Sequence, residues 1–335
     1  MLVFMALGGV AQALSVDIPT VLQGKKGGAL ASAVREHCRP ERVLSQMYGE
    51  GGVWAAFRTT DADGDGHVVD RYSSECRLFN ADGVSPTVGM LTDCIVNPSW
   101  WATDASAAEG VDFDLYNLIP CNSEVPGNKK MYPPGIVTNA AYDNGFWRSG
   151  IGSLSGVEVN FYEPADEYKG DFARAIMYVA VVYPCKLWSN LGENFFDDNS
   201  FPTLNGYSRE LLLKWHRADP VSFLETRRND AVEAIQGNRN PFVDYPDIAE
   251  HIWGDKADES FDNPDEPTPL KAVYSLKEAR IHLISPYVPT DAKWTVDGRA
   301  VESSYVETAS LGVGVHELRF SSATKSGKLK IRIVE

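Results

Sequence analysis

A short acidic, proline-rich stretch, 255–269, divides the chain into two unequal parts and most constrains its fold. It holds six acidic residues against one lysine, three prolines and almost no apolar side chain. Because such a segment buries little apolar surface, it is typical of a linker. We therefore expect two domains, 20–254 and 270–335, which agrees with a length of 335 residues.

The larger part, 20–254, carries the periodicity of helices. Apolar residues recur at helical spacing between about 166 and 254. Asp219 followed by Pro220 is typical of a helix start, and Gly237 of the stop that belongs to it. We therefore expect a mainly helical domain here.

The smaller part, 270–335, is built differently. Short runs of alternating apolar and polar residues, such as 280–284 and 329–334, are separated by glycines, as in strands and turns. The segment from Trp294 to Gly298 looks like the strand and turn of an immunoglobulin-like domain. The predicted fold class is therefore α+β, with a mainly helical part followed by a small all-β sandwich.

The N-terminal residues resemble a secretion signal. Leu2 to Leu7 form a short apolar run, and small residues follow, as in the hydrophobic region and cleavage site of a signal peptide. We expect a signal segment at 1–19 and a secreted or periplasmic protein, with a buried N-terminal segment as the alternative. No stretch reaches the roughly 18 apolar residues that cross a bilayer, so we expect no membrane span.

Charge and residue spacing exclude several classes of function. With a net charge of −15, the chain cannot hold a polyanion by overall attraction, so a nucleic-acid role needs a local site. The five cysteines form no Cys-x-x-Cys pair, which excludes zinc-knuckle and thioredoxin-like sites. In an oxidising compartment they allow one or two disulfides. The histidines are dispersed, and we expect packing rather than catalysis from His216 and His251.

An acidic turn lies between two apolar runs. Asp61, Asp63, Asp65 and Gly66 imitate the opening of an EF-hand loop, whose carboxylates bind calcium. The glutamate that such a loop needs at its twelfth position is Tyr72 here. A plain Asp/Gly turn is therefore preferred, and calcium binding is the alternative.

A second stretch, 88–135, has little regular periodicity and is rich in Trp, Asn, Pro and Asp. Asp93, Asp114, Asn117 and Asn122 offer hard oxygen ligands within it. Such oxygens suit Mg²⁺ or Ca²⁺ rather than zinc. This stretch is the first candidate for a functional site.

Residues 162–174, Tyr-Glu-Pro-Ala-Asp-Glu-Tyr-Lys-Gly-Asp-Phe-Ala-Arg, resemble a helix entry of the bacterial endonuclease I family. Segments within 54–73 and 211–253 are similar to that family too, so the resemblance covers roughly 20–254. It implies a secreted or periplasmic nuclease, built on a ββα-metal (His-Me) finger, that hydrolyses DNA or RNA. In such a finger a histidine takes a proton from water, and one Mg²⁺ stabilises the phosphorane and the leaving oxygen.

Part of the family's motif is present. Residues 114–120, Asp-Leu-Tyr-Asn-Leu-Ile-Pro, match its second half, and the resemblance makes Asn117 the metal ligand on the helix. Lys129 stands where the family has an arginine for phosphate, which keeps the charge but loses the bidentate fork.

The first half of the motif is altered. The family's Arg-Glu-His falls on Thr92, Asp93 and Cys94. Asp93 keeps a carboxylate for Mg²⁺ with a shorter reach. Cys94 replaces the base, and a thiol with a pKa near 8.5 is mostly protonated at neutral pH. General-base catalysis is typically worth about 10² to 10⁴ in rate, so the enzyme would be slower by about that factor.

Two hypotheses follow from the resemblance. The first is a secreted, metal-dependent nuclease of impaired activity, with Asp93 and Asn117 holding Mg²⁺. The second is an inactive pseudo-nuclease that keeps the fold as a nucleic-acid-binding or structural domain. A sharper variant of the second has a disulfide between Cys94 and Cys121, whereas a plain alternative makes Cys94 a small buried apolar residue.

Basic side chains allow two interpretations of the helical domain. They line a path for phosphates, or they pair with the many acids, which is the more common situation. The residues in question are Lys129, Lys130, Arg174, Arg228 and Arg239.

Overall fold

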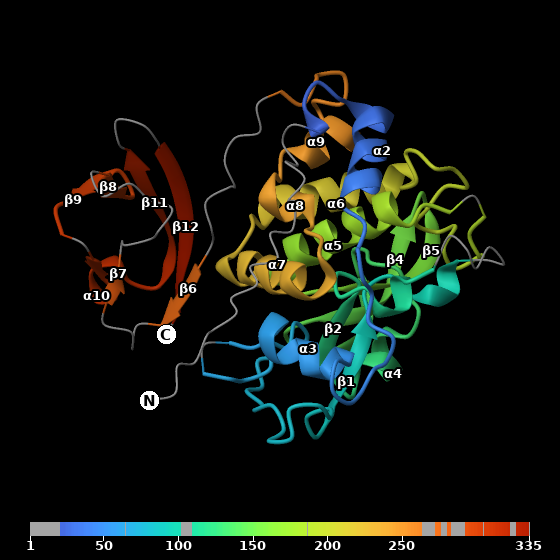
Figure 1. Cartoon of the computed structure of the whole chain (residues 1–335), viewed down its shortest axis with the longest axis horizontal. Helices are drawn as coiled ribbons and strands as arrows, with labels where there is room; N and C mark the ends of the chain where they lie inside the picture. Colours follow the sequence, from blue (N-terminus) through green and yellow to red (C-terminus); the bar gives the residue numbers. More distant parts are fainter. Residues whose placement is uncertain are drawn as a thin grey trace, which may run out of the picture.

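The computed structural model describes residues 21–63, 65–101, 109–185, 187–262, 272–275, 280–282, 292–303, 305–321 and 326–334. The predicted signal segment, 1–19, and the second half of the predicted linker, 263–269, lie outside the described residues. The described chain is α+β, as the sequence predicts, with a larger body of helices and small sheets and a smaller body of strands (Figure 1).

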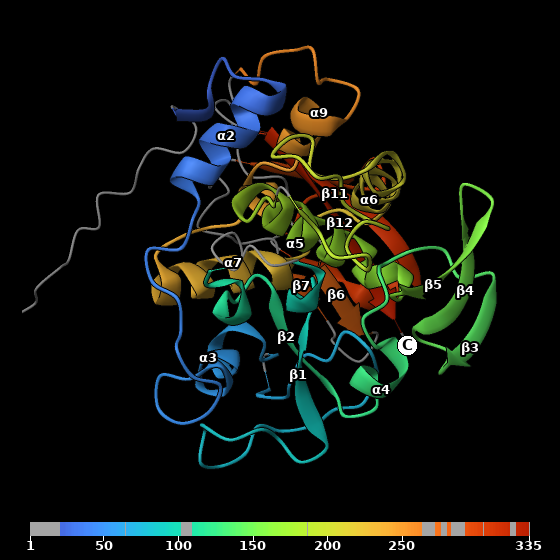
Figure 2. The same cartoon turned by 90° about the vertical axis from the view of Figure 1, so that its right-hand side faces the viewer.

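Helices make up most of the larger body. They are α2 (Gly27–His37), α3 (Val53–Thr60), α4 (Val125–Lys129), α5 (Lys169–Val182), α6 (Gly206–Ala218), α7 (Phe223–Gln236), α8 (Pro241–Asp244) and α9 (Ile248–Trp253), with 3-10 turns η1 (Pro98–Trp100), η2 (Val111–Phe113) and η3 (Asp166–Tyr168). The central helix is α5, which is buried along almost its whole length and packs against α2, α6 and α8 (Figure 2).

The start of α7 differs from the sequence expectation. Ser222 caps it in a capping box with Glu225, whereas Asp219 ends α6 and accepts a hydrogen bond from the backbone N–H of Gly170. In the capping box the backbone N–H groups of Ser222 and Glu225 each donate to the other residue's side chain. A helix start at Asp219 would lack these two hydrogen bonds. The predicted stop at Gly237 is confirmed by its left-handed backbone, with a φ of 80°.

In the described part of the larger body, the strands form two antiparallel sheets. The first pairs β1 (Met90–Cys94) with β2 (Leu118–Asn122), and α4 follows β2 directly. The second is a meander of β3 (Asn139–Asp143), β4 (Arg148–Leu154) and β5 (Val157–Glu163). Because β5 leads into η3 and α5, the segment 162–174 joins this sheet to the central helix.

The body does not end at the predicted boundary of 254. Phe261 is buried, and its backbone pairs with that of Lys25, which lies near the start of the described chain. The first part of the predicted linker therefore packs as structure.

The smaller body is mainly β. Its sheet has the order β6-β12-β11-β8-β9, in which β6 and β12 are parallel and the other neighbours antiparallel. A second sheet pairs β7 with β10. The elements are β6 (Ala272–Ser275), β7 (Arg280–His282), β8 (Lys293–Val296), β9 (Arg299–Val301), β10 (Tyr305–Glu307), α10 (Thr308–Leu311), β11 (Gly314–Ser321) and β12 (Ser326–Val334).

A small core joins these strands. It contains Ile281, Val296, Val306, Leu318, Ile331 and Ile333. Asp297 and Gly298, with φ values of 48° and 78°, form the two-residue turn between β8 and β9, where the sequence predicts a strand and turn.

Candidate active site

The candidate site lies where β1 ends. Antiparallel pairing places Asp93 opposite Ile119 and Cys94 opposite Leu118. The chain then turns from β2 into α4, so that the last residue of α4, Lys129, reaches back to the end of β1. The order of strand, strand and helix brings three of the four predicted site residues together.

A buried ion pair occupies the centre of this site. Lys129 donates from Nζ to Oδ2 of Asp93 at 2.6 Å and to the backbone carbonyl of Cys94 at 2.9 Å. Lys129 is 3% exposed and Asp93 is 8% exposed. The lysine that the resemblance assigns to phosphate is therefore bound to the carboxylate that it assigns to Mg²⁺.

Two tyrosines complete the surroundings. The hydroxyl of Tyr72 donates to the same Oδ2 of Asp93 at 2.7 Å. Nζ of Lys129 lies 4.6 Å from the ring centroid of Tyr162 and 5.9 Å from that of Tyr72, within the range of cation–π attraction. Neither tyrosine was expected at this site, although both lie in segments that resemble the family, 54–73 and 162–174.

Cys94 is a neutral thiol in this environment. Burial raises its pKa to about 12; the charge of Asp93 adds to the shift, and the charge of Lys129 opposes it. A thiol with that pKa is protonated at neutral pH and supplies neither a general base nor a thiolate nucleophile. The position that the family gives to histidine thus has no proton acceptor here.

Asn117 lies outside any helix, immediately before β2, and its backbone carbonyl accepts from the N–H of Ile95 at 2.8 Å. Its side-chain carbonyl accepts from the backbone N–H of Val96 at 2.8 Å, and its amide nitrogen donates to the carbonyls of Val96 and Val111 at 3.0 and 3.2 Å. The fully buried amide fastens two loops. The expected place on a helix is not formed, and backbone groups bond to both ends of this side chain. The role of Asn117 as a metal ligand stays a prediction.

Asp114 also has a structural role. Its carboxylate is fully buried and accepts from the hydroxyls of Tyr178 and Tyr183 and from the amide of Gln236. Through these bonds, the segment that precedes β2 is held against α5 and α7.

These residues do not fit a Mg²⁺ ion. The ion needs near-octahedral oxygen ligands, and the carboxylate of Asp93 is already bonded to an ammonium and a hydroxyl. A divalent cation beside Lys129 would place two cations on one buried carboxylate, at a large cost in a medium of low dielectric constant.

The thiols do not form the bridge that one hypothesis required. All five cysteines are free. In the register of β1 and β2, Cys121 lies opposite Leu91 and Cys94 opposite Leu118, so their side chains point to opposite faces of the hairpin.

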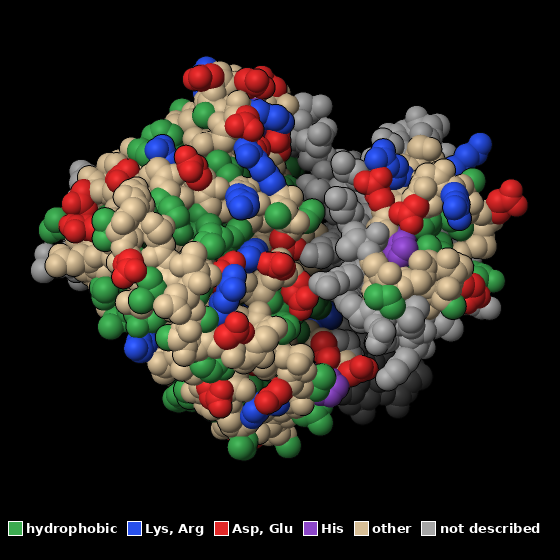
Figure 3. Space-filling view, turned by 180° about the vertical axis from the view of Figure 1, so that it is seen from behind, with side chains coloured by type: hydrophobic (Ala, Val, Ile, Leu, Met, Phe, Trp, Pro, Cys, Tyr) green, Lys and Arg blue, Asp and Glu red, His purple; other side chains and the backbone are tan. Residues whose placement is uncertain are grey.

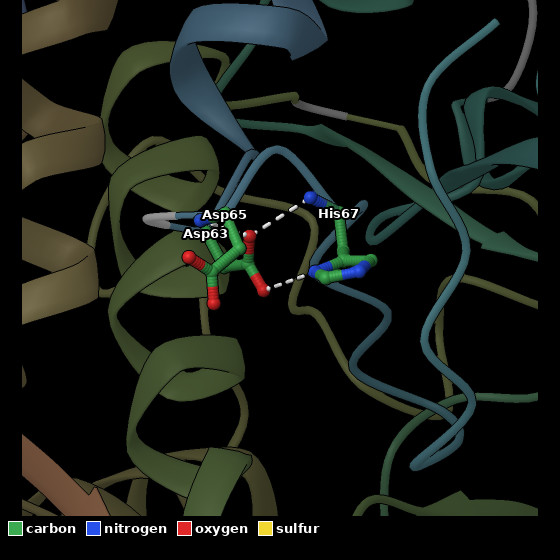
Figure 4. A group of neighbouring side chains, drawn as sticks. All are labelled: Asp63, Asp65 and His67. Carbon is green, nitrogen blue, oxygen red and sulfur yellow. Dashed lines mark hydrogen bonds and ion pairs between the residues drawn. The ribbon is translucent and has the colours of Figure 1, made fainter. Parts of the chain in front are cut away.

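Within the described residues, one group of three potential metal ligands lies close together. Ligand atoms of Asp63, Asp65 and His67 are all within 4.8 Å of one another at the tip of a hairpin turn (Figure 4). Asp63 accepts from two backbone N–H groups of this turn and from Nδ1 of His67. Asp61 points inward to Arg71 and Arg228, so the arrangement of an EF-hand loop is not formed.

The arginines of the helical body pair with acids, as the more common alternative predicts. Arg174 is fully buried and holds Glu225, Arg228 holds Asp61, and Arg239 holds three carboxylates. On the face drawn in Figure 3, Lys and Arg side chains alternate with Asp and Glu and form no single basic patch. These arginines therefore leave little free charge for phosphates.

Comparisons with known proteins agree with the resemblance. A family model described as Endonuclease I matches residues 26–247. An "Extracellular ribonuclease" of Bacillus subtilis (strain 168) is 30% identical over 243 residues, covering 69% of this chain and 76% of that protein. A second "Extracellular ribonuclease", of Bacillus amyloliquefaciens, is 31% identical and covers 69% and 75%. No helix in the described parts of the chain is long and apolar enough to cross a membrane.

Proposed function

From the premise that this chain belongs to the endonuclease I family, we propose that it is a pseudo-nuclease, which keeps the family's fold without metal-dependent hydrolysis of phosphodiesters. The observation that carries the proposal is the bond between Nζ of Lys129 and Oδ2 of Asp93. It neutralises the carboxylate on which a catalytic ion would depend.

The base position supports the same conclusion. The thiol of Cys94 stays protonated at neutral pH, since burial raises its pKa to about 12. Loss of a general base lowers a rate by roughly 10² to 10⁴. Loss of the ion removes a further stabilisation of developing charge, so the two defects together leave little catalysis.

The domain organisation is part of the proposal. The order β1, β2, α4 supports a ββα finger within 20–254. The mixed sheet and the turn at Asp297 and Gly298 support an immunoglobulin-like β-sandwich in 270–335, joined to it by the acidic linker. We infer an extracellular location because both relatives are named extracellular.

A slow nuclease is the second candidate. The names of the two relatives favour it, and the aligned region covers about three quarters of each of them. In this alternative the chain hydrolyses RNA or DNA with a base other than Cys94. Any nucleic acid would bind weakly and in a salt-sensitive manner, because the net charge is −15 and the three arginines are paired.

Digestion of plasmid DNA and of total RNA with Mg²⁺ or Mn²⁺ separates the two candidates. We expect no cleavage by the wild-type chain. The triple variant Asp93→Glu, Cys94→His, Lys129→Arg restores the family's residues at these three positions and is expected to cut. Cys76→His, at an exposed cysteine, is the matched control and stays inactive. Metal-dependent cleavage by the wild type that Asp93→Asn abolishes would overturn the proposal.

A further inference from the structure

We propose that Lys129 is a built-in cation that takes the place of the metal, so that the β1–β2–α4 unit is assembled around an ammonium group and needs no divalent ion. The inference rests on the proposed function and goes one step deeper, because it says what holds the site together. Its consequence is a pocket that accepts a small cation once the lysine is truncated.

The contacts of Nζ are those of a cation site. One carboxylate oxygen and one backbone carbonyl oxygen lie at 2.6 and 2.9 Å, and the faces of two tyrosine rings lie within 6 Å. Oxygens of this kind bind hard cations, and aromatic faces favour ammonium over a strongly hydrated divalent ion. The pocket therefore matches the ion that it holds.

Charge balance at the site also favours a single positive charge. Asp93 contributes one negative charge, Lys129 one positive charge, and Tyr72 a neutral hydroxyl donor on the same carboxylate oxygen. A divalent ion in place of the ammonium would leave a net positive charge in a buried site.

The lysine also has a mechanical role. Helix α4 has five residues and is too short to be stable by itself. Lys129 is its last residue, and its side chain ties the helix to both Asp93 and the carbonyl of Cys94 at the end of β1. The next residue, Lys130, has a φ of 53°, a backbone conformation that a non-glycine residue keeps only where its surroundings hold it.

Thermal unfolding of the full chain, followed by tryptophan fluorescence, tests the inference. We expect the Tm of the wild type to be the same in EDTA, MgCl₂ and MnCl₂. Lys129→Ala is expected to lower the Tm by roughly 10 °C, since it leaves a buried carboxylate unpaired. Ethylammonium chloride is expected to restore part of this loss, because the ion fits the vacated space.

Three controls keep the result specific. Lys130→Ala removes an exposed ammonium that contacts the hydroxyl and the ring of Tyr132, and it should show no rescue. NaCl at equal ionic strength should not replace ethylammonium. If Lys129→Ala does not fold, Lys129→Met keeps the stem, and its Tm should fall below that of the wild type without rescue.

Two results would overturn the inference. One is a rise in the wild-type Tm with Mn²⁺ that persists in Asp65→Asn, since it would place a metal outside the hairpin group. A rise that Asp65→Asn removes comes from that group and agrees with the inference. The other is an unchanged Tm in Lys129→Ala, or rescue by NaCl alone. Digestion is a separate readout, so a chain whose Mn²⁺ response persists in Asp65→Asn but that cuts nothing would refute this inference and leave the proposed function intact.

Discussion

The ammonium of Lys129 lies 2.6 Å from Oδ2 of Asp93, and both side chains are buried between the end of β1 and the end of α4. Lys129 of α4 thus neutralises the carboxylate of Asp93, which by the resemblance would bind Mg²⁺. The same contact explains why the hairpin and the helix hold together, and several measurable properties depend on it.

Asp93→Asn is expected to destabilise the protein by about 3–5 kcal/mol, because it leaves a buried ammonium without its counter-ion. Urea unfolding measures this change. Glu75→Gln breaks an exposed ion pair with Arg77 and serves as the control, with an expected loss below about 1 kcal/mol. Equal stability of the two variants would mean that the buried pair does not form.

Cys94 is expected to resist alkylation at pH 8. Its pKa of about 12 leaves a thiolate fraction roughly 10³ below that of an ordinary cysteine thiol. Mass spectrometry after iodoacetamide treatment should find Cys76, which is exposed, modified long before Cys94. Rapid modification of Cys94 in the folded protein would show an activated thiol and reopen a nucleophilic role.

Asn117→Ala is expected to cost roughly 3 kcal/mol of stability, about 1 kcal/mol for each of three buried hydrogen bonds. Asn122→Ala is the matched control, since Asn122 accepts one exposed bond from the N–H of Glu124. A stable Asn117→Ala protein that loses a metal response would instead restore the ligand role that the resemblance assigns.

Acid should destabilise the protein through His216. Burial and the nearby charge of Arg174 lower its pKa to about 4, whereas an unfolded histidine titrates near 6.5. Between these values the unfolded chain binds more protons, so the contribution present above pH 6.5 is lost as the pH falls towards 4. The loss amounts to about 3 kcal/mol. His216→Gln should flatten the stability profile between pH 4 and 6.5, and His37→Gln should not.

Local patterns could predict much of the fold. The helices between 166 and 254 and the stop at Gly237 follow from periodicity and capping chemistry. The start of α7 was not predicted correctly, because Ser222 and Asp219 are both residue types that favour an N-cap. Only the packed structure shows that Asp219 accepts from the N–H of Gly170 instead. Capping rules rank residue types and leave such a choice to tertiary contacts.

The candidate site could be predicted only in part. The motif located Asp93, Cys94 and Lys129, which the structure brings together. Sequence did not show that Lys129 bonds to Asp93, because the two residues are 36 positions apart and meet only through the pairing of β1 and β2. The resemblance places Asn117 on a helix, whereas it lies immediately before β2. A short motif also does not reveal which backbone groups an amide side chain binds.

Calorimetric titration of the full chain with MnCl₂ tests the central claim most directly. We predict that Asp93 binds no Mn²⁺, so Asp93→Asn should leave the titration of the wild type unchanged. Any heat from binding at Asp63, Asp65 and His67 should disappear in Asp65→Asn. Binding of one Mn²⁺ per chain that persists in Asp65→Asn and is lost in Asp93→Asn would contradict the account, since Asp93 would then hold a metal rather than Lys129.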